Sequence, residues 1–283
     1  MAMKAIIGVD GSRYSEWLLG WLSKMPFRSS PRVTAVHAID FDSARAPFVT
    51  HPSVSGHEPD EGEAIHLVET RAKQVEMETK QRMAELGLEG SVRVEKGQIA
   101  HALLRRAGRT ALIAVGSRGL DAVDRFVLGS VSTAITVHAR SPVLIVKEPP
   151  QTIRRILFAT DGSPSSTKAL QFLTKQFKVK SEAEPLHILL VHVMPFLRYT
   201  VVKEAGEKLL AQEAAKLEKA GYRVREFPRV GPAAEEIMKV VNREQPDLIV
   251  TGAKGRSAMA RFLLGSVSTK LIHQSACSVL VVR

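Results

Sequence analysis

The sequence predicts two tandem α/β domains, each with a five-stranded parallel sheet covered by helices on both faces. Three observations carry this prediction. The chain of 283 residues suits two domains of about 140 residues each. Its second half repeats the order of segments in its first half. Within each half, short apolar runs alternate with longer amphipathic segments, which is typical of βαβ units whose strands are buried on both faces.

The apolar runs give the expected strands and the amphipathic segments give the expected helices. In the first half we predict strands at 4–10, 32–39, 91–96, 111–115 and 142–147, and helices at 13–25, 61–87, 98–109 and 130–139. In the second half we predict strands at 155–160, 186–193, 222–227, 247–251 and 278–282, and helices at 164–177, 200–220, 232–244 and 266–275.

The two halves also match in local sequence. Residues 4–10 (KAIIGVD) correspond to residues 155–161 (RILFATD), and residues 142–147 (PVLIVK) correspond to residues 278–283 (SVLVVR). Between the halves, residues 148–152 hold two prolines, which disfavour a helix and remove donors from a strand. We therefore predict domains at 1–147 and 153–283, joined by this linker.

Composition narrows the class of protein. The apolar runs are too short for a signal peptide or a membrane span, so we expect a cytoplasmic protein without a membrane partner. Cys277 is the single cysteine and lies in an apolar segment, which favours a buried thiol over a reactive one. Of the net charge of +11, the second half carries +9, but no single face is expected to collect it. With few aromatic residues for base stacking, nucleic acid is not an expected partner.

The most informative motif occurs twice. Residues 116–133 and residues 252–269 share the spacing of three glycines followed by Ser-Val-Ser-Thr, and 11 of the 18 aligned positions are identical. Each copy follows a predicted strand and leads into a predicted helix. Backbone amides at a helix N-terminus favour anions, and glycines let a ligand approach the backbone, so the motif predicts a phosphate site in each half. The hydroxyl groups of Ser130, Ser132, Ser266 and Ser268 are candidate phosphate donors or, alternatively, helix caps.

The end of the first strand in each half is expected at the same edge. In a sheet of order 3-2-1-4-5 the direction of the order reverses between strands one and four, and ligands bind beyond the carboxyl ends of these strands. Asp10 with Gly11, and Asp161 with Gly162, follow strand one. These residues would face the same crevice as the glycine loops, either as helix caps, as ligand contacts, or as both.

Other chemistry is less well supported by the sequence. The chain has no GxxxxGK[ST] motif, no GxGxxG motif after the first strand and no GxSxG elbow, which disfavours Walker-type NTPases, dinucleotide dehydrogenases and serine hydrolases. No catalytic constellation is predicted. His37 and His192 lie at equivalent strand ends, where a half-exposed position is the simpler interpretation. Three histidines near the long segment 41–63 lack a recognised metal spacing, so no metal site is predicted.

These residues resemble the nucleotide-binding branch of the universal stress protein family, whose signature G-x2-G-x9-G-[ST] after strand four is matched in both halves. The resemblance covers nearly the whole chain and implies a Rossmann-like fold of the adenine nucleotide alpha hydrolase type, with ATP in the crevice. The site residues that follow for the first half are Asp10, Gly11, Ala38, Gly116, Arg118, Gly119, Gly129, Ser130, Val131 and Ser132. Those for the second half are Asp161, Gly162, Val193, Gly252, Lys254, Gly255, Gly265, Ser266, Val267 and Ser268.

The resemblance also indicates partners and roles. Ala38 and Val193 would meet the adenine, and Arg118, Lys254 or a magnesium ion would offset the triphosphate charge. The last strands, 142–147 and 278–283, would pair within the chain, and the resulting unit could form a homodimer. We expect ATP to be a structural or regulatory ligand in a stress response, with slow hydrolysis at most. The alternatives are an interaction module with vestigial sites, acting through an unidentified protein partner, and a slow ATPase. A lid formed by residues 41–63 would serve mainly the first site.

Overall fold

The computed structural model describes residues 2–39, 61–117, 128–179, 185–196, 199–255 and 264–283. In the first half these residues form β1 (Lys4–Gly8), α1 (Arg13–Lys24), β2 (Arg32–Ile39), α3 (Glu61–Glu85), β3 (Gly90–Lys96), α4 (Ile99–Ala107), β4 (Leu112–Gly116), α5 (Ser130–His138) and β5 (Val143–Val146). In the second half they form β6 (Arg155–Thr160), α6 (Pro164–Gln176), β7 (His187–Met194), α7 (Tyr199–Lys219), β8 (Arg223–Val230), α8 (Ala233–Glu244), β9 (Leu248–Gly252), α9 (Ser266–Gln274) and β10 (Val279–Val282).

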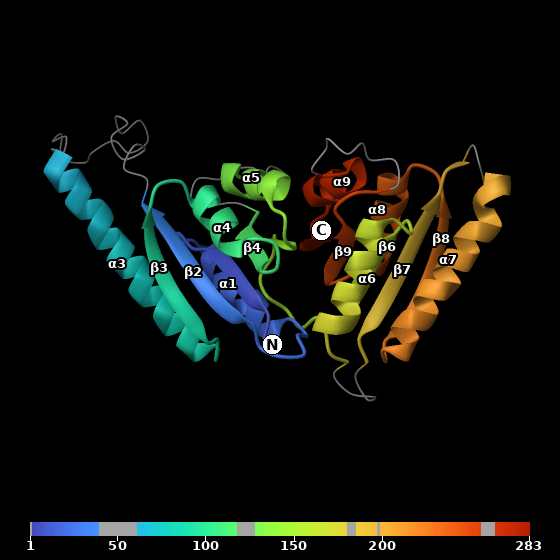
Figure 1. The fold of residues 1–283 in the computed structure, drawn as a ribbon, viewed down its shortest axis with the longest axis horizontal. Helices are drawn as coiled ribbons and strands as arrows, with labels where there is room; N and C mark the ends of the chain where they lie inside the picture. The colour runs from blue at the N-terminus through green and yellow to red at the C-terminus, as the bar shows by residue number, and fades with distance from the viewer. Residues whose placement is uncertain (1, 40–60, 118–127, 180–184, 197–198, 256–263) are drawn as a thin grey trace.

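The described strands form one continuous sheet in the order β3-β2-β1-β4-β5-β10-β9-β6-β7-β8. Each half therefore has the predicted order 3-2-1-4-5, and the strands within a half are parallel. Figure 1 shows the halves side by side, with α3 and β3 at one end of the molecule and α7 and β8 at the other. The predicted α/β fold class is confirmed, and the element boundaries agree with the predictions to within a few residues.

The largest boundary difference is at β8, which continues to Val230 instead of ending at residue 227. Pro228 lies inside this strand, opposite His192 of β7. A proline lacks the N–H donor that a central strand needs, so it normally indicates the end of a strand. Because β8 is an edge strand, one missing donor is tolerated there.

Each face of the sheet has its own apolar core, and each core runs through both halves. One core contains buried residues of α1, α3, α6 and α7, such as Leu18 and Leu170. The other contains buried residues of α4, α5, α8 and α9, such as Leu103 and Val240. Alternate residues of a strand point to opposite faces, so Leu144 of β5 joins the first core and Ile145 joins the second.

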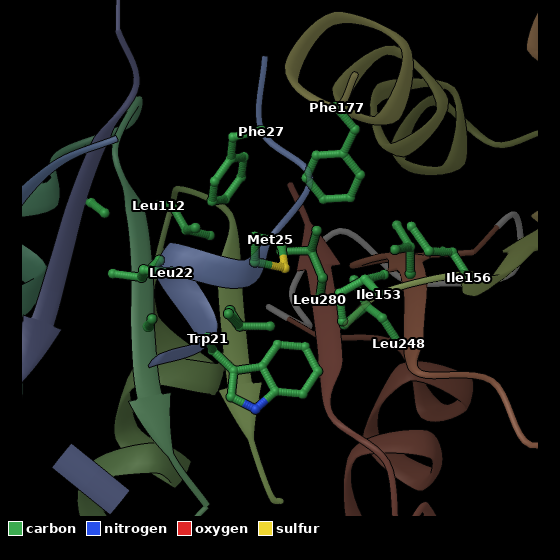
Figure 2. Packing of buried hydrophobic residues seen from close by; sticks show 14 of the residues in the cluster. Trp21, Leu22, Met25, Phe27, Leu112, Ile153, Ile156, Phe177, Leu248 and Leu280 are labelled. Atoms are coloured by element: carbon green, nitrogen blue, oxygen red, sulfur yellow. The ribbon is translucent and has the colours of Figure 1, made fainter. Parts of the chain in front are cut away.

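The two halves are joined through their last strands, as predicted. The β5 and β10 strands are antiparallel, with Leu144 opposite Leu280. A second joint lies after α1 and α6, where the rings of Phe27 and Phe177 pack edge to face with centroids 5.4 Å apart. Figure 2 shows Trp21 and Met25 packed in the same region as Leu280 and other apolar residues of the second half. The pairing covers two strand edges that would otherwise be open.

The linker is also held against the first half. The indole Nε1 of Trp21 donates a hydrogen bond of 2.8 Å to the carbonyl oxygen of Glu148, and the Lys24 Nζ donates to the carbonyl oxygen of Pro150 at 2.9 Å. A side chain at Gly20 would lie 2.5 Å from the Pro150 ring, so the linker passes directly over α1 at this glycine. These contacts order the connection between the halves.

Candidate functional site

The central strands of each half place the candidate site at the carboxyl edge of the sheet. The first strand pairs directly with the fourth, with Ile6 opposite Ile113 in the first half and Leu157 opposite Ile249 in the second. From these neighbouring strand ends the chain leaves toward opposite faces, to α1 or α6 on one side and to α5 or α9 on the other. This is the arrangement at which ligands bind in open α/β sheets.

The helices that follow the glycine loops begin at glycines. The N-cap of α5 is Gly129 and the N-cap of α9 is Gly265. Neither helix start therefore has a hydrogen bond from a backbone amide to the side chain of its N-cap residue. The first helical amides that donate to these caps are those of Thr133, at 2.9 Å, and Thr269, at 3.0 Å. Among the described residues, the three amides before each of them, at residues 130–132 and 266–268, therefore have no hydrogen-bond acceptor. Three free donors at a helix N-terminus suit an anion such as phosphate.

Neither glycine cap is needed for its backbone angles. Gly265 has φ −78° and ψ 155°, and Gly129 has φ −64° and ψ 161°, both of which any residue adopts. The reason for glycine at 265 is space, because a Cβ atom there would lie 3.3 Å from the Ala253 carbonyl oxygen and 3.5 Å from the Gly255 amide nitrogen. A side chain at this position would fill the space between the loop and the start of α9.

The other described glycines of the second loop are in close contact with the protein itself. A Cβ atom on Gly252 would lie 2.6 Å from the carbonyl carbon of Ser165 in α6, and one on Gly255 would lie 2.8 Å from Oδ2 of Asp161. Gly252 therefore allows α6 to pack against the end of β9. Gly255 allows the loop to reach the carboxylate that follows β6, so the loop and Asp161 lie together as predicted.

The serine hydroxyl groups differ from the expectation for two of the four. The Oγ of Ser132 donates to the carbonyl oxygen of Gly116, and the Oγ of Ser268 donates to that of Gly252 at 2.7 Å. Both side chains are buried, so their hydroxyl hydrogens hold the loop to the helix instead of facing solvent. Ser130 and Ser266 are exposed. The donors that this site can offer to a ligand are thus the backbone amides and the hydroxyl groups of Ser130 and Ser266, but not those of Ser132 and Ser268.

Asp10 and Asp161 support the turns that follow β1 and β6. Asp10 Oδ1 accepts from the amide of Ser12 at 2.9 Å and from the hydroxyl of Ser15 at 2.8 Å. Asp161 Oδ1 accepts from the amide of Ser163 at 3.0 Å. This is the capping role that the sequence left open beside ligand contact. The second turn is also tied to its loop, because the Ser163 hydroxyl donates to the Lys254 carbonyl oxygen at 3.0 Å.

The two histidines have matching contacts in the two halves. Nδ1 of His37 lies 2.8 Å from the carbonyl oxygen of Val9, and Nδ1 of His192 lies 2.9 Å from that of Thr160. Since a carbonyl oxygen only accepts, both Nδ1 atoms carry a hydrogen, which leaves Nε2 as the second nitrogen of each ring. His37 is half-buried, whereas His192 is buried and not half-exposed as expected. Ala38 and Val193, the next residues, are half-buried at these strand ends.

Two charged residues near the sites were missed from the sequence. The guanidinium of Arg71 on α3 covers Gly11, with Nη2 only 2.6 Å from where a Cβ atom would be. On α7, Glu213 is 4% exposed, and burial raises the pKa of its carboxyl group although a hydrogen bond with Thr160 opposes this. Glu213 was detectable, because it shares an apolar helical stripe with Leu210 and Leu217. For Arg71 the sequence offers no comparable signal.

Some predicted site residues lie outside the described part of the chain. These are Arg118 and Gly119 in the first loop, together with most of the long segment 41–63 and its proposed lid. In the described ranges, no cluster of three or more His, Cys, Asp or Glu side chains could hold a metal ion. The same ranges contain no helix with the length and apolar character to cross a bilayer.

Comparison with known proteins identifies the family. The model of the universal stress protein family matches residues 1–147 and again residues 152–283. The chain belongs to the universal stress protein family. It is 27% identical over 292 residues to a universal stress protein of Mycolicibacterium smegmatis. This alignment covers 98% of this chain and 96% of that protein. A universal stress protein of Mycobacterium tuberculosis is 26% identical over 302 residues, with the same coverage of 98% and 96%.

A solved structure agrees with this assignment at the level of the fold. The crystal structure of a universal stress protein from Archaeoglobus fulgidus superposes with a TM-score of 0.72 and covers 100% of this chain and 97% of its own. The two sequences are 22% identical over this match. The Archaeoglobus fulgidus protein thus shares the fold found here.

Proposed function

We propose that this universal stress protein binds ATP in each half, with the triphosphate on the free amides at the start of α5 and α9. The observation that carries the proposal is the pair of glycine-capped helices at the switch points of the sheet. A Ser, Thr, Asp or Asn at the cap would satisfy one helix amide with its side chain. Both halves instead have glycine at this position, which leaves three donors and the positive end of the helix dipole for a ligand.

The remaining parts of the nucleotide follow from the neighbouring strands. Ala38 and Val193, at the ends of β2 and β7, would contact the adenine in this proposal. Lys254, and Arg118 in the other loop, would lie near the phosphates, and a magnesium ion would supply further positive charge. Oδ2 of Asp161, which reaches the loop at Gly255, would lie beside the nucleotide.

We further propose that ATP is a structural or regulatory ligand in the stress response of the cytoplasm and not the substrate of a fast reaction. Fast hydrolysis needs a general base or a water-positioning group aligned with the terminal phosphate. The carboxylates that follow β1 and β6 already accept hydrogen bonds from the turns they support. Glu213 is 4% exposed, so its carboxylate is a poor candidate for a base that contacts the nucleotide.

The experiment is to purify the protein without added nucleotide, denature it in acid and separate the released small molecules by chromatography. We expect adenine nucleotide in the supernatant. Calorimetric titration of nucleotide-free protein should then give up to two ATP per chain. If no nucleotide is released and ATP produces no heat, the sites are vestigial and the protein acts as an interaction module. Turnover well above background that is lost in Asp10→Asn or Asp161→Asn would instead indicate an ATPase.

A further inference from the structure

Basic side chains gather at the amino ends of three neighbouring strands in the second half. Arg155 of β6 lies opposite His187 of β7, and His187 lies opposite Arg223 of β8. Residues in register on adjacent parallel strands are about 4.8 Å apart and point to the same face. Arg225, two residues after Arg223, points to this face as well. Three arginines of the second half therefore lie together at this face, which the sequence did not single out.

These residues surround a hollow in the surface. Its volume is about 270 Å³, and its polar lining consists of Arg155, His187, Arg223, Arg225 and one carboxylate, that of Glu244. The hollow lies at the opposite end of β6 from Asp161. Five steps of about 3.3 Å lead from Arg155 to Thr160, so the two ends of this strand are roughly 16 Å apart. The hollow is thus distinct from the candidate nucleotide site.

Two described carboxylates near the hollow, those of Glu244 and Asp247, are already paired. Glu244 accepts from Arg225 Nη1 at 3.1 Å through one oxygen and from Arg243 Nε at 2.8 Å through the other. Asp247 Oδ2 accepts from the backbone amides of Arg154 and Arg155, each at 2.7 Å. Within the described part of the chain, the Arg223 guanidinium has no hydrogen bond or ion pair. The hollow consequently keeps a surplus of positive charge and of unused N–H donors.

Part of this surface is fixed in place before any ligand binds. The guanidinium carbons of Arg225 and Arg243 lie 4.9 Å and 5.5 Å from the ring centre of Phe227. Phe227 is buried, and the Arg155 guanidinium donates to the Glu244 carbonyl oxygen at 2.7 Å. Stacked and hydrogen-bonded arginines lose less side-chain entropy when an anion binds, and their planar donors match phosphate oxygens.

The corresponding place in the first half lacks this character. There Lys4 lies opposite Arg32, and the register of β2 and β3, with Val33 opposite Gly90, puts Glu89 beside Arg32. The first half therefore has a carboxylate where the second half has Arg223, and it has Ser91 where the second half has Arg225. The repeat provides an internal comparison, since the same fold needs no arginine cluster at this edge.

We propose that this hollow is a further anion site, separate from the two candidate nucleotide sites, and that it binds a small compound with two or more linked phosphate groups. The class of ligand follows from the charge, the arginine geometry and the limited volume. A nucleic acid is less well suited, because Phe227 is buried under arginines and offers no face for base stacking. The proposal does not depend on ATP binding in the candidate nucleotide sites.

The test uses inorganic tripolyphosphate as the probe and calorimetry at about 100 mM salt. The background is the full chain with Gly265→Ala, which fills the space beside the second loop, and with the matching substitution Gly129→Ala in the first half. We expect tripolyphosphate to bind this background, and Arg223→Ser to weaken its affinity about tenfold or more. The matched control is Arg32→Ser, which removes the same charge from the equivalent edge of the first half. It should change the affinity by less than about twofold.

Several results would overturn the proposal. These are no binding to the background, equal weakening by both serine variants, or an oligoribonucleotide that binds tighter than tripolyphosphate with the same dependence on Arg223. Titration of ATP into the background separates two sources of the same chemistry. If ATP competes with tripolyphosphate, the ligand of the hollow is the phosphate tail of a nucleotide. If only tripolyphosphate binds, the ligand is a free polyphosphate. If the wild type does not bind ATP but does bind tripolyphosphate, only the proposed function is contradicted.

Discussion

Filling the space beside the second glycine cap should weaken ATP binding while leaving the fold stable. In Gly265→Ala the new methyl group would lie 3.3 Å from the Ala253 carbonyl oxygen, which requires a shift of a few tenths of an ångström. The backbone angles already suit alanine, so the substitution restricts the unfolded chain and contributes about 0.4–1 kcal/mol of stability. This offsets the lower preference for alanine at a cap. The free energy of unfolding should stay within about 1 kcal/mol of the wild type.

The affinity for ATP should change much more. The methyl group would occupy the space between the loop and α9, through which a phosphate must approach the amides of residues 266–268. Loss of one hydrogen bond to a charged group costs about 1.5–3 kcal/mol, which corresponds to roughly a 10- to 150-fold weaker Kd. The first half is unchanged, so if the wild type binds two ATP as proposed, titration calorimetry should find one tight ATP per chain for this variant.

A matched control separates the backbone from the hydroxyl groups. Ser266→Ala removes an exposed hydroxyl but keeps the amide, so it should weaken ATP binding by less than about threefold. Urea unfolding of each variant measures the stability. The reasoning is refuted if Gly265→Ala binds two ATP with wild-type affinity, or if its affinity falls only together with a stability loss above about 2 kcal/mol.

Three further predictions concern buried groups. Burial raises the pKa of the Glu213 carboxyl group above its usual 4.5, so the wild type should lose stability as the pH rises from 4.5 through the higher pKa of the folded state. The Glu213→Gln variant should become more stable relative to the wild type across that pH window. Urea titrations that show a gain independent of pH would contradict this. Burial raises the pKa of the Cys277 thiol to about 12. At pH 8 a thiol reagent should therefore modify the folded protein roughly a thousandfold more slowly than the urea-unfolded protein. Similar rates would show that the thiol is accessible in the folded protein. Trp21→Ala should cost about 3–5 kcal/mol and keep one calorimetric transition, since the apolar core spans both halves; two separated transitions would show that the halves unfold independently.

Most of the fold could be predicted because local pattern and topology agree along this chain. Parallel strands buried on both faces form continuous apolar runs, as in β4 and β9, and the amphipathic segments between them have helical periodicity. Because the two halves repeat the same order of segments, each predicted element in one half supported its counterpart in the other. The pairing of the last strands, 142–147 with 278–283, came from the resemblance to the family, since edge pairing leaves little local signal; its register was not predicted. The strand predicted at 222–227 ends just before Pro228 and was too short, because the sequence does not show that this strand is at the edge, where a proline is tolerated.

The candidate site was predictable in position but less so in detail. The spacing of the glycines places the loops at the carboxyl edge, because strand ends and helix starts are local features. Whether a hydroxyl such as that of Ser268 faces solvent or a carbonyl oxygen depends on contacts between segments far apart in the sequence. The same holds for Arg71 over Gly11 and for the arginines around Glu244, which come from different strands and helices. Such groupings become visible only when the register is known.

The most direct test of the account is a crystal structure of the protein with ATP and magnesium. The account predicts phosphate oxygens within about 2.7–3.2 Å of the amide nitrogens at the start of α5 and α9, with nothing covalent formed. Density for the nucleotide elsewhere, or helix starts that stay without a phosphate at saturating ATP, would contradict it.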